Sequence, residues 1–121
     1  MNKIADFELW LKPPSVNAYW KKTRSGGRMV SEEARQFKKD FIYSVRERGV
    51  TGKPSKKRIE LHLDLYFKDK RKKDIDNYCK GILDSMSGLI FEDDEQIDKL
   101  IINKIIGYGR DKIGIVAYEK E

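Results

Sequence analysis

The segment Ile59–Met86 reads IELHLDLYFKDKRKKDIDNYCKGILDSM, and three patterns follow one another along it. Apolar and polar residues first alternate from Ile59 to Phe67, which is the period of a half-buried β-strand. Lys68–Lys73 then contains five basic residues and one acid. From about Asp76 to Met86, apolar residues recur at helical spacing. The segment therefore predicts a strand, a basic loop and a helix in succession.

The flanking sequence predicts a second helix and further strands. Ser31–Arg48 is expected to be helical because its apolar residues fall at spacings of three and four, at Ala34, Phe37, Phe41 and Val45. Ser31 is suited to cap the start of this helix. Further strands are expected at Ile4–Leu11, Gln96–Tyr108 and Ile113–Tyr118.

The order of these elements indicates the fold class. The last two strands are expected to form a hairpin through Gly107–Asp111, because glycines and an aspartate separate two β-branched runs. The order β, α, β, α, β, β then predicts an α+β fold, a mixed β-sheet with two main helices packed on it. At 121 residues the chain is expected to form one domain spanning 1–121.

Composition narrows the class of partner. Charged residues make up 38% of the chain, and 26 basic against 20 acidic side chains give a net charge of +6. This balance favours an anionic partner, with nucleic acid ahead of an acidic membrane. The chain has no apolar run of the roughly 18 residues that a spanning helix needs. Asp6 and Glu8 interrupt the apolar core that a signal peptide would have.

Cysteine and histidine are too few for several kinds of site. A single cysteine, Cys79, excludes an internal disulfide and a cysteine-cluster zinc site. We expect Cys79 to be buried and the protein to be cytoplasmic. His62 is the only histidine, on the polar face of its strand, so a zinc-binding histidine cluster or a Ser-His-Asp triad lacks its parts. Asp74–Lys80 lacks the glycine and glutamate of an EF-hand loop.

The acidic residues that follow the basic loop suggest a metal site. Asp74 and Asp76 stand where the loop gives way to the helix, and Asp93 and Asp94 lie in an acidic cluster after it. Clustered carboxylates repel phosphate unless a cation lies between them, and Mg²⁺ prefers such oxygen ligands. Either Asp93 or Asp94 can supply a third carboxylate, so the pattern indicates metal-dependent phosphodiester cleavage. Helix capping and a solvated turn are the ordinary alternative roles of these acids.

The same residues form a set of motifs. They are DIDN at Asp74–Asn77, Lys80 one turn later, Asp84, FEDDEQI at Phe91–Ile97, PPSVNAYW at Pro13–Trp20 and MVSEEARQFK at Met29–Lys38. Together with the basic loop, these motifs resemble the RusA family of Holliday-junction resolvases. The resemblance covers most of the chain and agrees in the order of elements.

The resemblance implies a specific activity and site. It implies a homodimer that binds four-way DNA junctions and makes paired symmetric nicks with Mg²⁺, and with Mn²⁺ also supporting activity. Asp74, Asp76 and Asp94 match the essential carboxylates that hold the metal, and Lys80 matches a lysine needed for cleavage. Asp93 is the next candidate for the third ligand, since the segment after Asp84 is one residue shorter than in the family pattern.

The remaining expectations concern DNA and biological setting. The cations expected to contact DNA phosphates are Lys68, Lys70, Arg71, Lys72, Lys73, Lys21, Lys22, Arg24 and Arg28. The resemblance also implies a bacterial protein encoded by a phage or prophage. Two alternatives stay open: a module that binds branched DNA without cutting it, and a related nuclease that acts on flaps or forks.

Overall fold

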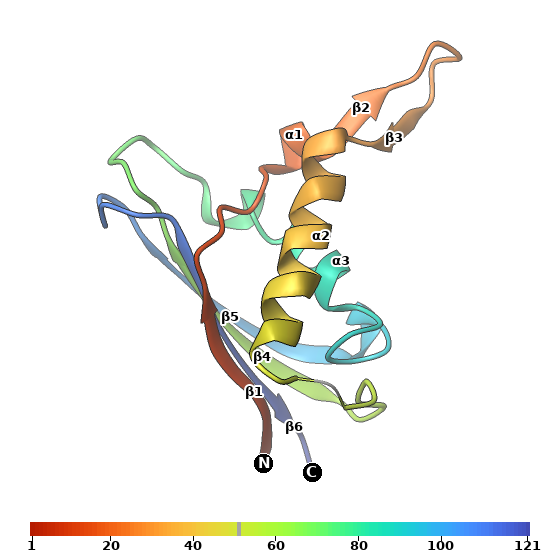
Figure 1. Ribbon diagram of the computed structural model, residues 1–121, viewed down its shortest axis with the longest axis vertical. Coiled ribbons are helices and arrows are strands. Elements are labelled where there is room, and N and C mark those ends of the chain that lie inside the picture. The colour runs from red at the N-terminus through yellow and green to blue at the C-terminus, as the bar shows by residue number, and fades with distance from the viewer. Residues whose placement is uncertain (51) are drawn as a thin grey trace.

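The computed structural model describes residues 1–50 and 52–121, which form a twisted sheet with helices on one face (Figure 1). Within those residues the main sheet has four strands, β1 Asn2–Leu9, β4 Ile59–Tyr66, β5 Ile97–Ile105 and β6 Lys112–Glu119. Their order across the sheet is β1-β6-β4-β5. Strand β6 is antiparallel to both of its neighbours, whereas β4 and β5 are parallel. The predicted α+β class with a mixed sheet is therefore confirmed.

The parallel pair determines where the predicted site residues lie. Parallel neighbours need a crossover connection over one face of the sheet, and the chain from β4 to β5 provides it. This crossover contains the 3₁₀ turn η1 Ile75–Asn77, the helix α3 Lys80–Met86 and the 3₁₀ turn η2 Asp94–Gln96. The four residues predicted for catalysis all lie within it, namely Asp74, Asp76, Lys80 and Asp94.

The predicted hairpin between the last two strands is wrong. Strand β4 lies between β5 and β6 and pairs with both. The connection Ile106–Asp111 crosses the end of β4 and bonds to the chain that continues it, because Gly107 N donates to Asp69 O and Tyr108 N donates to Phe67 O at 2.9 Å. The backbone amides of Gly107 and Tyr108, which a tight hairpin would need, are therefore bonded to the segment that contains Phe67 and Asp69.

The helix of the crossover begins later than predicted. Instead of one helix from about Asp76, the chain makes the η1 turn, and α3 begins only at Lys80. Between them Tyr78 has φ −124° and ψ 8°, outside the helical region, and its ring packs edge-on against Phe67 with centroids 4.8 Å apart. This packing offsets the cost of the interruption, and Cys79, as predicted, is buried beside it.

Helix α2, Glu32–Glu47, agrees with its prediction. The Ser31 hydroxyl accepts a hydrogen bond from Ala34 N at 3.1 Å, which satisfies one free amide of the first turn. The four predicted apolar residues are buried, and with side chains of the sheet and of α3 they form the core, which includes Leu9, Phe37, Phe41, Val45, Leu63, Ile82 and Met86.

Within residues 1–50 and 52–121, no helix combines the length and apolar character needed to span a membrane.

The other basic segment, Lys21–Arg28, forms a small hairpin. A short helix, α1 Val16–Tyr19, leads into β2 Trp20–Lys22, which pairs antiparallel with β3 Arg28–Val30. Gly26 lies at the tip with φ 87°, a backbone conformation that residues other than glycine rarely adopt. Figure 1 shows the hairpin projecting away from the sheet, beyond the start of α2.

Candidate functional site

Asp74 and Asp76 lie at the beginning of the crossover, on either side of the half-exposed Ile75. Both aspartates are exposed, and Asp74 has extended backbone with φ −85° and ψ 124°. Its backbone carbonyl accepts from Asn77 N at 3.0 Å, but its carboxylate does not cap the η1 turn. Among the described residues, neither carboxylate makes a side-chain hydrogen bond or ion pair. Both carboxylates are therefore accessible from solvent, as ligands for an incoming cation must be.

The basic loop before them is organised around one acid. The Asp69 carboxylate binds Lys73 Nζ at 2.6 Å and Arg71 Nη2 at 3.0 Å. Lys73 is only 7% exposed, and its ammonium lies 5.2 Å from the centre of the Phe67 ring. Unlike the other cations predicted to contact DNA phosphate, Lys73 is buried, and its charge is already paired. The other predicted cations of the loop are exposed, namely Lys68, Lys70, Arg71 and Lys72.

The ion pairs of Asp69 predict how stability depends on pH. Hydrogen bonds from Lys73, and then from Arg71, hold the pKa of Asp69 well below its usual range. A carboxyl whose pKa is lower in the folded than in the unfolded protein stabilises the fold at pH values above its unfolded pKa of about 3.9. This stabilisation is lost as the pH falls and the carboxyl of the folded protein becomes protonated. We expect Asp69→Asn to lower the thermal midpoint at pH 6, and the gap from wild type to narrow between about pH 4 and pH 2.

Thermal denaturation at several pH values measures this gap. Asp6→Asn is a suitable control, since its pair with Lys3, 2.9 Å apart, is exposed on both sides. Such pairs contribute little, so this variant should stay close to wild type throughout. A gap for Asp69→Asn that is constant with pH would contradict the assignment.

Lys80 lies at the start of α3 in contact with residues from distant parts of the chain. Its ammonium is 3.3 Å from the Asp84 carboxylate and 5.6 Å from the centre of the Tyr19 ring. The Tyr19 hydroxyl also donates a short hydrogen bond to Asp84. Burial, followed by this hydrogen bond, raises the pKa of Tyr19, so the hydroxyl remains a donor. The Trp20 ring is a further neighbour, 6.0 Å from the ammonium.

Asp94 lies at the far end of the crossover and is half-buried. Burial, and then the neighbouring Asp93, raise the pKa of Asp94, with a further contribution from Asp84 and an opposing one from Lys80. The η2 turn that carries Asp94 contacts α3, which begins at Lys80. The η2 turn that presents it is anchored by Gln96, whose amide donates to the carbonyls of Ser55 and Lys57, each at 2.8 Å.

The predicted metal ligands are not gathered into one complete cluster. Lys80 pairs with Asp84, and Asp94 lies on the η2 turn that contacts α3, whereas no hydrogen bond or ion pair within the described residues joins Asp74 or Asp76 to these side chains. Among residues 1–50 and 52–121, no three His, Cys, Asp or Glu side chains are placed to hold a metal ion. The predicted ligands Asp74, Asp76 and Asp94 nevertheless suit a hard cation, because all three offer carboxylate oxygens. Asp74 and Asp76 are also exposed, and neither is paired within the described residues.

Sequence reasoning named Asp84 only as part of a motif and did not identify Tyr19 or Trp20 as neighbours of Lys80. Tyr19 and Asp84 are 65 positions apart, so no local spacing could pair them. The one available signal was the motif that contains Tyr19 and Trp20. His62 is half-buried, and its ring nitrogen Nε2 lies 2.8 Å from the Glu60 carboxylate.

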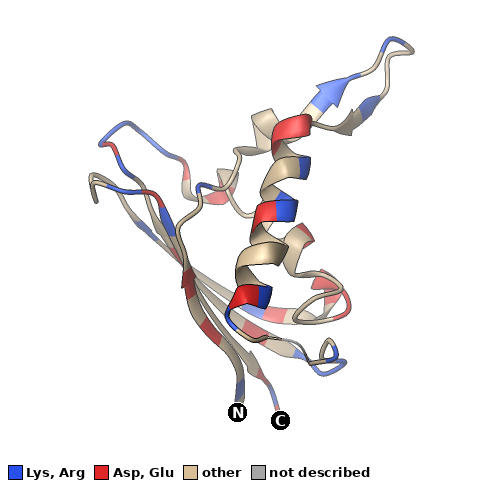
Figure 2. Cartoon of the chain, viewed as in Figure 1, with Lys and Arg blue, Asp and Glu red and all other residues tan. Residues whose placement is uncertain are grey.

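The predicted cations of the hairpin are at the surface. Lys21, Lys22, Arg24 and Arg28 are exposed, and Figure 2 shows basic residues on both strands of the hairpin as well as on the loop before Asp74. The Arg28 guanidinium lies 4.8 Å from the centre of the Trp20 ring. Since Trp20 is also near Lys80, the base of the basic hairpin adjoins the candidate site.

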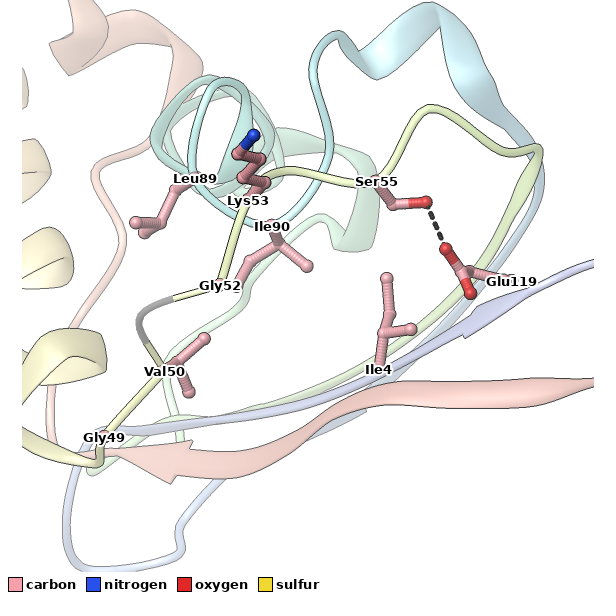
Figure 3. A pocket seen from close by; sticks show the side chains of 9 residues that line it. All are labelled: Ile4, Gly49, Val50, Gly52, Lys53, Ser55, Leu89, Ile90 and Glu119. Atoms are coloured by element: carbon pink, nitrogen blue, oxygen red, sulfur yellow. Dashed lines mark hydrogen bonds between the residues drawn. The ribbon is translucent and has the colours of Figure 1, made fainter.

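A separate cavity of about 350 Å³ lies between the ends of α2 and α3 and the strands β1 and β6. Its described lining contains apolar side chains such as Ile4 and Ile90 and none of the predicted site residues (Figure 3). Of its polar side chains, the Ser55 hydroxyl donates to the Glu119 carboxylate at 2.6 Å, and Lys53 also contributes to the lining. The cavity is therefore separate from the acidic residues predicted to hold a metal.

Comparisons with known proteins agree with the motifs. A family model described as endodeoxyribonuclease RusA matches residues 11–116. The chain is also 32% identical over 110 residues to a protein of Enterobacteria phage HK97 named crossover junction endodeoxyribonuclease RusA. That alignment covers 90% of this chain and 90% of the phage protein. The matched range includes the whole β4–β5 crossover and the basic hairpin.

Proposed function

Because the chain belongs to the RusA family of endodeoxyribonucleases, we propose that it resolves Holliday junctions by two symmetric nicks with Mg²⁺ as cofactor. Membership makes it a structure-selective nuclease for four-way DNA junctions. Nucleases of this family depend in general on a divalent metal. The choice of Mg²⁺, with Mn²⁺ as a working substitute, follows from the all-oxygen donor set.

Each group of residues has a role in the proposed mechanism. Asp74, Asp76 and Asp94 would hold the metal, which when bound lowers the pKa of a water and stabilises charge on the phosphate. Lys80, held in place by Asp84, offsets charge on the scissile phosphate. Asp84 in turn accepts a hydrogen bond from the Tyr19 hydroxyl. It is therefore proposed to position Lys80 and not to contact the substrate.

The DNA is positioned by phosphate contacts outside this centre. The exposed cations of the basic loop and of the hairpin are suited to that task, namely Lys68, Lys70, Arg71, Lys72, Lys21, Lys22, Arg24 and Arg28. Such contacts fix register and orientation but do not read sequence. The observation that best supports the proposal is the exposed pair Asp74 and Asp76 directly after a basic loop, inside the region matched by the family.

Cleavage of a labelled synthetic four-way junction tests the proposed function. We expect paired nicks with Mg²⁺ or Mn²⁺ and none with EDTA. Duplex, flap and fork substrates of the same arm sequences serve as comparisons, and they should be cut slowly or not at all. Tight binding without cutting under either metal would favour a non-cleaving binding module, and faster cutting of flaps or forks would assign the nuclease another substrate.

We also propose that the chain acts as one domain over residues 1–121 and as a homodimer. A four-way junction requires symmetric cuts, and a two-fold dimer supplies two identical sites related by the same symmetry. Light scattering of the free protein and of its junction complex measures this directly. The phage relative further supports a phage or prophage gene and action in the bacterial cytoplasm.

A further inference from the structure

An exposed tryptophan stands where β1 ends and β6 begins. Trp10 is 50% exposed, and the guanidinium carbon of Arg110 lies 3.8 Å from the centre of its indole ring. Arg110 is exposed as well, so the stacked pair faces solvent. We call these two residues the Trp10 platform. A large aromatic ring left open to water forgoes the stabilisation of burial, so a partner that covers it would gain binding free energy.

The platform rests on a fixed cation surrounded by aromatic rings. Lys112 is only 7% exposed, and its ammonium lies 4.3 Å from the ring centre of Tyr66, 4.9 Å from that of Tyr108 and 5.2 Å from that of Trp10. Glu8 pairs with the same ammonium at 2.9 Å. Tyr108 is 45% exposed and extends the aromatic surface beside the platform.

Backbone hydrogen bonds join this region to the basic loop that precedes Asp74. Gly109 N donates to Lys68 O at 3.1 Å, and Lys68 N donates to the Asp111 carboxylate at 2.8 Å. The connection that holds Arg110 therefore runs beside the basic loop, as Figures 1 and 2 also show. A strand that contacts the loop through its phosphates can reach the platform with a neighbouring base.

The other side of Trp10 is unsuited to phosphate. There it borders a cleft of about 380 Å³ against α2, whose lining carries two acids, Glu33 and Asp40, and one cation, Lys12. The net negative charge of this lining disfavours a DNA backbone, whereas Arg110 and the basic loop attract it. The charges thus direct a bound strand along the basic side of the platform.

We propose that the Trp10 platform stacks a nucleobase left unpaired at the branch point of the DNA substrate while the basic loop binds the adjacent phosphates. Aromatic rings and guanidinium planes stack on any base, so such a contact selects for an open strand and not for sequence. Paired bases within a duplex have no free face to offer. The inference rests on the proposed function for the identity of its substrate.

Binding of labelled oligo-dT and of a duplex of equal length, measured in EDTA, tests the platform. We expect Trp10→Leu to weaken binding of the single strand by about 5- to 100-fold, with a change below about twofold for the duplex. Trp10→Phe should recover most of the affinity, because a ring that can stack is restored. Tyr43→Ala, which removes a 67% exposed aromatic side chain on α2, is the matched control and should bind as wild type does.

An unchanged affinity of Trp10→Leu for the single strand would overturn the proposal, as would an equal loss for single strand and duplex. No cleavage occurs in EDTA, so these results do not depend on nuclease activity. Failure of wild type to cut a junction with Mg²⁺ would instead count against the proposed function.

The fluorescence of Trp10 gives a second measurement that a purely structural role would not change. The chain has two tryptophans, so Trp20→Phe leaves Trp10 as the sole tryptophan, whose emission can be excited selectively over that of tyrosine. Stacking of a base on the indole should quench this emission as oligo-dT is added, along the same titration curve as binding. Binding without any change in emission would overturn the proposal.

Discussion

Asp76→Asn is expected to lower Mg²⁺-dependent junction cleavage by about 10³-fold or more while leaving junction binding intact or tighter. A catalytic metal supplies several kcal/mol of charge stabilisation, and each 1.4 kcal/mol corresponds to about tenfold in rate. The exposed carboxylate of Asp76 makes no ion pair within the described residues, so its loss should not unfold the protein. Removing a negative charge beside the basic loop should also favour phosphate binding.

Single-turnover cleavage with Mg²⁺, together with junction affinity in EDTA, measures both expectations. Glu47→Gln makes the same change of charge at an exposed position near the end of α2 and should cut at the wild-type rate. Cleavage by Asp76→Asn at the wild-type rate would remove Asp76 from the metal site. Parallel losses of cleavage and affinity would indicate a role in binding or folding.

Those parts of the fold that depend on local pattern could be predicted from the sequence. The spacing of Ala34, Phe37, Phe41 and Val45 defines a helix face, and all four are buried. The alternation along Ile59–Phe67 likewise identifies β4, whose apolar positions are buried. In both cases the period of apolar residues alone decides the element and its inner face.

Pairing between strands could not be predicted in the same way. Strands β5 and β6 follow each other in the chain and have β-branched residues, which favours a hairpin locally. In the structure β6 lies between β1 and β4, and the connection before it bonds to a segment some 40 positions earlier, because Gly107 N and Tyr108 N donate to the carbonyls of Asp69 and Phe67. No short-range signal encodes that choice.

The candidate site shows the same division. Asp74, Asp76, Lys80 and Asp94 were identified by motif, and all lie in one crossover, but the burial of Lys73 was missed. A run of cations resembles a solvated phosphate-binding loop, and only the fold reveals that the Asp69 carboxylate and the Phe67 ring hold one of them inside. A count of charges therefore overestimates the cations available to DNA.

Asp94→Asn is expected to reduce junction cleavage by about 10²-fold or more, whereas Asp93→Asn should retain most of the activity. Asp94 is half-buried, and it lies on the η2 turn, which contacts the helix that carries Lys80 and Asp84. Asp93 has a structural role, because its side chain accepts from Gln96 N while Gln96 Oε1 accepts from Asp93 N at 2.8 Å. Asparagine caps a turn about as well as aspartate, so Asp93→Asn preserves that geometry.

The two variants therefore differ by one position but change the same charge by the same amount, and each serves as the control for the other. Cleavage rates as a function of Mg²⁺ concentration distinguish the roles. If Asp94 is the third ligand, its variant should need far more Mg²⁺ or stay inactive at any concentration, with Asp93→Asn following the wild-type curve. The reverse ranking would assign the metal to Asp93, and equal, small effects would exclude both from the metal site and leave the crossover with only the first acidic pair.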